Sequence, residues 1–227
     1  HDIEQLEYLI GKGIIAPGYR DGISALESCL RELEGEFERS YMAEIPPALL
    51  ARVAPFYNRL VSYHDAPELP GPAVNPALDR ARLEADYAAT GPGIVWVDDL
   101  LTPAALSGLR RFCLESTVWF DCSYPDGYLG AYVEEGFICP LLAQIARELP
   151  RSLPGIFRAE PLTHLWAYKY DSTLSGIGVH GDFAAVNVNF WITPDEANLA
   201  PGRGGLVVWD KEAPADWDFE TYNKNVP

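Results

Sequence analysis

The chain has little positive charge, and it lacks any long apolar run. Of its 227 residues, 17 are Lys or Arg and 33 are Asp or Glu, so the formal net charge is −16. Like charges repel at long range, which argues against a nucleic-acid backbone or an anionic membrane as partner. No apolar stretch approaches the length that spans a bilayer. We therefore predict a small molecule or a protein as partner, with neither nucleic acid nor membrane.

Sulfur is also scarce. The single methionine is Met42, and the 4 cysteines form no C-x-x-C pair. In a chain of this length such cysteines do not indicate a disulfide framework, and they predict buried free thiols in a reducing, cytoplasmic protein. Because the sequence starts at His1 and stops at Pro227 within what reads as a domain, we expect it to be part of a longer protein.

What the chain does have is a hydrophobic content of 48% and an aromatic content of 12%, which predict a packed globular core. Apolar residues recur at helical spacing in three early stretches, 3–10, 24–33 and 47–64. A segment rich in proline, 66–76, follows these stretches and predicts a linker. We therefore predict a helical region over 1–75 and a second domain over 76–227.

The second domain reads as a mixture of helices and short strands. Helices are predicted over 77–89 and over 140–149. A further helix is predicted to begin after Thr102, which would cap it, with Pro103 in its first turn. Strands are predicted over 94–97, 118–120, 164–170, 186–193 and 206–209. Short strands separated by turns, with helices before them, predict the α+β class and a jelly roll, that is, a double-stranded β-helix with supporting helices.

The most informative stretch is the triplet His180-Gly181-Asp182. In an extended chain, residues two apart project from the same face, so the imidazole and the carboxylate can bind one metal ion together. This donor pair suits iron(II) when a second His completes a facial triad. Chance produces roughly 0.3 H-x-D triplets in a chain of this composition. The alternative is a surface turn in which Asp182 caps local backbone amides.

The context of the triplet strengthens the metal interpretation. The order of segments is a strand ending at Tyr170, then Gly176, His180-Gly181-Asp182, the predicted strand 186–193, and Gly204-Gly205 before an aliphatic strand. Upstream, residues 97–103 read V-D-D-L-L-T-P. Over roughly 94–209 this pattern resembles the prolyl-4-hydroxylase-like branch of the iron(II)/2-oxoglutarate-dependent oxygenases, in which a V-D-D-F-L-S/T-P entry precedes H-x-D and a G-G-x-L strand.

The resemblance implies a set of site residues. His180 and Asp182 would be two iron ligands, and Tyr170 matches a tyrosine that hydrogen-bonds 2-oxoglutarate in several members. The alternative for Tyr170 is aromatic packing on a strand. Asn189 shares one face of its predicted strand with Asn187 and is our candidate for a polar contact to the cosubstrate; the alternative is that both amides face outward. Phe190 stands where many relatives have a second tyrosine.

The pattern of the family is incomplete here. The third iron ligand of these oxygenases is a later His, followed by an Arg or Lys that pairs with 2-oxoglutarate. No His follows Asp182 in this chain, and the later cations are Arg203, Lys211 and Lys224. Either the missing ligand lies outside this sequence, or the protein is a degenerate jelly roll.

The sequence therefore predicts an iron(II)- and 2-oxoglutarate-dependent dioxygenase, a hydroxylase with an unidentified substrate. The alternative is a non-catalytic interaction module built from the jelly roll and the N-terminal helices. A cupin-like metal enzyme or a sugar-binding jelly roll fits less well, because cupin sites gather several His near one strand and only His180 occurs in this region.

Overall fold

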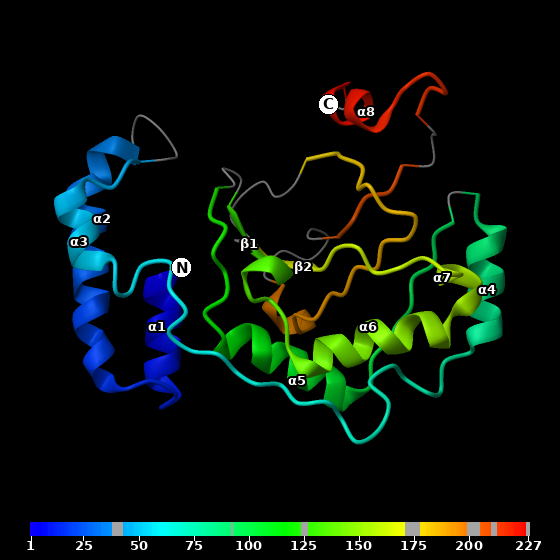
Figure 1. Cartoon of the computed structure of the whole chain (residues 1–227), viewed down its shortest axis with the longest axis horizontal. Coiled ribbons are helices and arrows are strands. Elements are labelled where there is room, and N and C mark those ends of the chain that lie inside the picture. The colour runs from blue at the N-terminus through cyan, green and yellow to red at the C-terminus, as the bar shows by residue number, and fades with distance from the viewer. Residues whose placement is uncertain are drawn as a thin grey trace. The chain divides into compact units, whose positions relative to one another are not determined.

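The structure is a computed structural model that describes residues 1–37, 43–91, 93–123, 127–170, 178–198, 205–209 and 213–225 (Figure 1). The chain divides into two compact units, each assembled from segments far apart in sequence. Unit 1 comprises His1–Ala66, Arg111–Ile138 and Leu165–Tyr170, and unit 2 comprises Pro67–Arg110, Cys139–His164 and Asp171–Pro227. The predicted division into domains 1–75 and 76–227 stays a prediction.

The early helices of unit 1 lie beside one another (Figure 1). They are α1 (Asp2–Gly11), the 3-10 helix η1 (Pro17–Tyr19), α2 (Arg20–Phe37) and α3 (Pro47–Val53). This confirms the helical interpretation of the early stretches. The helix predicted over 47–64 is shorter than expected and ends at Val53. Pro55 accounts for this end, because proline has no N–H for a helical hydrogen bond and its ring clashes with the preceding turn.

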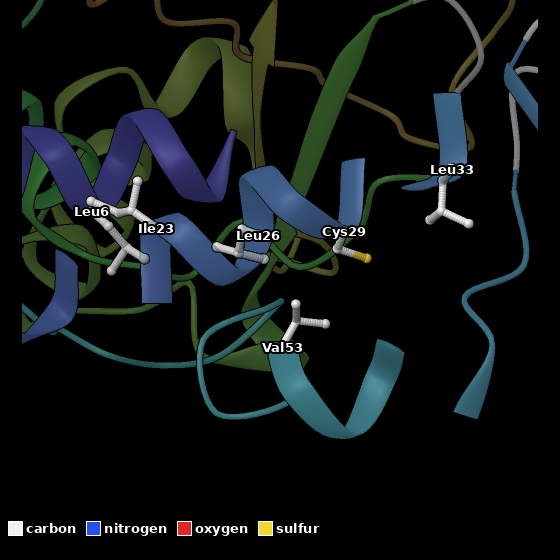
Figure 2. Close-up of a cluster of buried hydrophobic side chains, with 6 residues drawn as sticks. All are labelled: Leu6, Ile23, Leu26, Cys29, Leu33 and Val53. Atoms are coloured by element: carbon white, nitrogen blue, oxygen red, sulfur yellow. The ribbon is translucent and has the colours of Figure 1, made fainter. Parts of the chain in front are cut away.

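The three α-helices enclose a core of buried apolar side chains (Figure 2). Its members are Leu6 from α1, Ile23, Leu26, Cys29 and Leu33 from α2, and Val53 from α3. The spacing of three and four residues in α2 places its four members on one helical face, which explains why this face is buried. At Gly22 an added Cβ would lie 2.5 Å from Cδ1 of Phe56, so the close approach of this ring to α2 requires glycine.

A second part of unit 1 holds a two-stranded sheet. Strand β1 (Tyr128–Tyr132) pairs antiparallel with β2 (Trp166–Tyr170), and Tyr128 lies opposite Tyr170. The 3-10 helix η2 (Val133–Glu135) follows β1. The strand predicted over 164–170 is thus confirmed in its last five residues.

Unit 2 holds the remaining helices of the described chain. They are α4 (Arg80–Ala89), α5 (Pro103–Glu115, which continues into unit 1 after Arg110), α6 (Pro140–Ser152), α7 (Pro154–Phe157), the 3-10 helix η3 (Asp195–Ala197) and α8 (Phe219–Asn225). The predicted start of α5 is confirmed, since the Ala105 N–H donates to Thr102 Oγ1 at 3.3 Å. An added Cβ at Gly108 would lie 2.6 Å from Leu141 Cδ2, so α5 and α6 approach closely there.

Glu148 on α6 holds the proline-rich segment in place. Its Oε2 accepts hydrogen bonds from the backbone N–H groups of Ala73 and Val74, each at 2.8 Å. Its Oε1 accepts from the Gln144 side chain at 2.7 Å. Burial acts to raise the pKa of Glu148, but these donors, together with Arg147, outweigh it and lower the pKa below the ordinary value. The segment predicted as a linker is therefore fastened to a helix.

Glu148→Gln is expected to lower the free energy of unfolding by about 1–3 kcal/mol at neutral pH, since hydrogen bonds to a charged acceptor are lost. Because folding lowers the pKa of Glu148 from its ordinary value of 4.5, the stabilisation is present above pH 4.5 and is lost as the pH falls through the lower folded value. Denaturant unfolding of both proteins between pH 7 and pH 3 checks this. A difference that does not shrink in acid would contradict the proposed role of the carboxylate.

The predicted jelly roll is wrong. The part of the chain that the structure describes is mostly helical, with β1 and β2 forming a two-stranded sheet, and the predicted strands 94–97, 118–120, 186–193 and 206–209 are not strands. Alternating apolar residues show that a segment can present two different faces, but a strand also needs a neighbouring strand that pairs with its backbone groups. Residues 186–193 alternate, yet the backbone–backbone hydrogen bonds of the described segment 178–198 are local, such as Ala184 N–H to the Asp182 carbonyl at 2.9 Å.

Two further expectations concern the cysteines and the membrane. No disulfide joins the four cysteines, all of which lie in the described residues, and Cys29 and Cys139 are buried as predicted, whereas Cys122 is exposed. Among the helices of the described residues, none combines the length and the apolar content needed to cross a membrane.

Candidate metal site

His180 and Asp182 lie in unit 2, in the irregular segment 178–198. Their side chains converge, with His180 Nε2 and Asp182 Oδ1 separated by 3.6 Å. The two side chains are 45% and 33% exposed, so the pair sits at the surface of a loop and not inside the predicted barrel. The convergence of the two donor groups thus arises without the strand from which it was predicted.

The other ring nitrogen of His180 is held by the backbone. Nδ1 lies 2.9 Å from the carbonyl oxygen of Gly178. A carbonyl oxygen only accepts hydrogen bonds, so Nδ1 donates to it, and the neutral form of the ring with this hydrogen bond has its lone pair on Nε2. This nitrogen is the one that faces Asp182. Histidines that bind metals are commonly oriented in this way, by a backbone carbonyl on the nitrogen away from the ion.

The other oxygen of Asp182 is held by an amide. Asn187 Nδ2 donates to Asp182 Oδ2 at 2.8 Å, which leaves Oδ1 directed at His180. A lone pair on nitrogen and a carboxylate oxygen do not attract each other at 3.6 Å unless a proton or a metal cation lies between them. The four atoms are therefore arranged so that either a proton or a metal ion can lie between His180 Nε2 and Asp182 Oδ1.

The spacing of the two donors suits a metal ion. With bonds of about 2.1 Å to nitrogen and oxygen, two ligands of one ion lie roughly 3.0 Å apart in octahedral and 3.4 Å apart in tetrahedral geometry. The observed 3.6 Å needs only a small side-chain adjustment to reach either value. An imidazole nitrogen and a carboxylate oxygen are a donor set that iron(II), zinc and other divalent transition metals accept.

A third protein ligand is not found among the described residues, where no group of three His, Cys, Asp or Glu side chains is placed to hold a metal. The other histidines have other neighbours. His1 Nδ1 lies 3.1 Å from Lys169 Nζ, His64 Nδ1 lies 3.3 Å from Glu115 Oε2, and His164 Nδ1 lies 3.0 Å from Thr163 Oγ1. His180 and Asp182 are thus the two candidate ligands in the described residues, and the later cations Arg203 and Lys211 lie outside them.

Tyr170 belongs to unit 1 and not to the unit that carries the His–Asp pair. Its ring centroid lies 5.6 Å from that of Tyr128 and 6.2 Å from that of Tyr168, and burial raises the pKa of its hydroxyl. These contacts match the aromatic packing that was the alternative for Tyr170. Its hydrogen bond to 2-oxoglutarate stays a prediction.

Of the two predicted amides, Asn187 and not Asn189 contacts the pair. Asn189 is exposed, while Asn187 reaches back five residues to Asp182. Phe190 is exposed as well. The role predicted for Asn189 toward the cosubstrate stays untested, and the glycines at Gly176 and Gly204 lie outside the described residues.

Helix α8 supplies contacts that the sequence did not predict. The Gly181 N–H donates to Asn223 Oδ1 at 2.7 Å, and Asn223 Nδ2 donates to the Gly181 carbonyl at 3.1 Å. The ring of Phe219 lies 5.4 Å from that of Phe183. No local sequence pattern predicts these contacts, because the partners are about forty positions apart. A single asparagine on a short helix also forms no recognisable motif.

Comparisons of the chain with protein-family models, with curated protein sequences and with solved structures give no match. The resemblance to the iron(II)/2-oxoglutarate-dependent oxygenases therefore rests on the order of motifs in the sequence.

Proposed function

We propose that His180 and Asp182 bind one divalent transition-metal ion, and that the protein is an iron(II)- and 2-oxoglutarate-dependent dioxygenase that hydroxylates a substrate. The observation that supports the metal site is the orientation of the pair. Nε2 and Oδ1 face each other at 3.6 Å, while Nδ1 and Oδ2 are each occupied by a hydrogen bond of the protein. The order of motifs around the pair supports iron(II) and 2-oxoglutarate as the metal and the cosubstrate.

The residues of the chain have separate roles in this proposal. His180 and Asp182 would hold the ion, the Gly178 carbonyl keeps the proton of His180 on Nδ1, and Asn187 orients the carboxylate. Bound iron(II) with 2-oxoglutarate would supply oxidation of a C–H bond by molecular oxygen. Asp182 supports hydroxylation as the outcome, since a carboxylate ligand at this position leaves no place for a halide. Two protein ligands leave positions for a third ligand and for the cosubstrate.

The exposure of the site bears on the substrate. Because the pair lies on a partly exposed loop, with side chains 45% and 33% accessible, a large molecule can approach it as readily as a small one. The net charge of −16 favours a substrate that is not strongly anionic. Both a protein and a small molecule remain compatible with this surface.

Titration of the metal-free protein with iron(II) under anaerobic conditions tests the proposal. We expect one equivalent of iron(II) to bind, and subsequent 2-oxoglutarate to produce the weak visible absorption band of its iron(II) chelate. On admission of oxygen, succinate should form from 2-oxoglutarate in amounts that depend on the protein. His164→Ala is a suitable control, since His164 lies beside Thr163 and away from the proposed ligands in sequence.

The opposite results are equally clear. Absence of iron(II) binding would overturn the metal site and the oxygenase together. Binding of iron(II) without the band and without succinate would leave the metal site but overturn the oxygenase, and would favour the non-catalytic interaction module. The absence of a third ligand among the described residues is the observation that favours this second candidate.

A further inference from the structure

Gly181, the residue between the two proposed ligands, is held by hydrogen bonds from one side chain, that of Asn223. Asn223 on α8 accepts a hydrogen bond from the Gly181 N–H at 2.7 Å and donates one to the Gly181 carbonyl at 3.1 Å. The N–H of Gly181 belongs to the peptide plane shared with His180, and its carbonyl belongs to the plane shared with Asp182. A single amide therefore restrains the orientation of both peptide planes that carry the proposed ligands.

Aromatic rings also pack between α8 and the loop that carries the proposed ligands. The Phe183 and Phe219 rings meet edge to face, with centroids 5.4 Å apart and an interplanar angle of 72°. A Cβ added at Gly181 would lie 3.3 Å from Cε1 of Tyr222, closer than ordinary contact, so glycine allows α8 to lie against the backbone. The helix itself begins with a cap, since the Thr221 N–H donates to Asp218 Oδ1 at 2.8 Å.

The pair of hydrogen bonds between Asn223 and Gly181 requires an amide side chain. The Gly181 backbone presents one donor and one acceptor, and an asparagine side chain offers the complementary acceptor and donor. A carboxylate in that position would lack the donor, and an apolar side chain would lack both. This complementarity distinguishes Asn223 from a side chain that merely packs on the surface of a helix, and it indicates a specific role in holding Gly181.

We propose that α8 sets the spacing of the metal ligands and that Asn223 is a positioning residue of the site. This inference rests on the proposed binding of a metal by His180 and Asp182. Holding both peptide planes keeps Nε2 and Oδ1 3.6 Å apart, close to the spacing at which both atoms could bind one ion. Without the hydrogen bonds from Asn223, the loop must become ordered when the ion binds, and the entropy lost in that ordering weakens binding.

The test uses cobalt(II), whose visible spectrum reports coordination geometry, with the metal-free protein. Asn223→Ala is expected to weaken cobalt(II) binding by about 10–100-fold, the range typical of outer-shell partners, and to change the visible spectrum at saturation. Asn225→Ala is the matched control on the same helix. Its amide donates to the Thr221 carbonyl at 2.7 Å, within α8, and we expect wild-type affinity and spectrum.

Gly181→Ala is an independent second variant, whose added Cβ would press on the Tyr222 ring, displace α8 from the loop backbone and so also weaken binding. It decides the matter if Asn223→Ala fails to fold as judged by circular dichroism. Wild-type affinity and spectrum in the folded Asn223→Ala variant, or in Gly181→Ala, would overturn the positioning role while leaving the metal site standing. A wild-type protein that binds no cobalt(II) and no iron(II) overturns the proposed function itself, and is recognised before any variant is made.

Discussion

Substitution of either proposed ligand is expected to abolish metal binding. His180→Ala removes the nitrogen donor and Asp182→Asn removes the negative charge, so each should lower the affinity for iron(II) or cobalt(II) by at least about 100-fold, more than the loss of an outer-shell partner. In the proposed site both side chains hold one ion, so the double variant should lose little beyond either single variant. Calorimetric titration of the three variants measures these affinities.

Two comparisons make this result interpretable. Asp195→Asn, in the exposed helix η3, removes an equal charge from another part of unit 2 and is expected to leave the affinity unchanged. In the absence of metal, the ligand variants should unfold at nearly the same denaturant concentration as the wild type, because a partly exposed pair of polar side chains contributes at most about 1 kcal/mol, whether or not His180 is charged. Wild-type metal affinity in both single variants would show that the His–Asp pair is only a surface ion pair.

Phe112→Ala is expected to lower the free energy of unfolding by about 3–5 kcal/mol, the range for a buried phenylalanine. The Phe112 side chain is 0% exposed. Its ring centroid lies 5.8 Å from that of Tyr63 and 5.4 Å from that of Phe137, so truncation leaves a cavity and removes two ring contacts in unit 1. Denaturant unfolding followed by circular dichroism measures the loss.

The matched control is two positions further along α5. Leu114 is 51% exposed, and Leu114→Ala is expected to change the free energy of unfolding by less than about 0.5 kcal/mol. A loss below about 1 kcal/mol for Phe112→Ala would contradict the described packing. A large loss for Leu114→Ala would show that this side of the helix is covered.

The helices could be predicted because their signals are local. Leu26, Cys29 and Leu33 in α2 follow helical spacing, and Thr102 with Pro103 marks the start of α5. Such signals act between residues a few positions apart, where the backbone itself provides the hydrogen-bond partners. The start of α2 at Arg20 differed from expectation because boundaries depend on contacts as well as on periodicity, whereas α3 ended early, at Val53, because of Pro55.

The strands could not be predicted in the same way, because a strand depends on a partner that the segment does not contain. The alternation in 186–193 suggested a sheet, yet among the described residues the ladder formed is the one between β1 and β2. Tyr128 and Tyr170 pair across about forty intervening residues, and neither segment indicates which partner it will choose. The predicted jelly roll required a correct pairing partner for each of its strands, and the sequence of a strand does not identify that partner.

By itself, the sequence determined the acidic charge, the helical stretches and the presence of an imidazole and a carboxylate two residues apart. Tertiary structure decided that these two groups face each other at 3.6 Å on an irregular loop, with Asn187 on the carboxylate and Asn223 on the intervening glycine. The physical reason is the range of the interactions. Charge and helical periodicity are properties of neighbouring residues, whereas the direction of a side chain on a loop depends on hydrogen bonds from segments that only folding brings together.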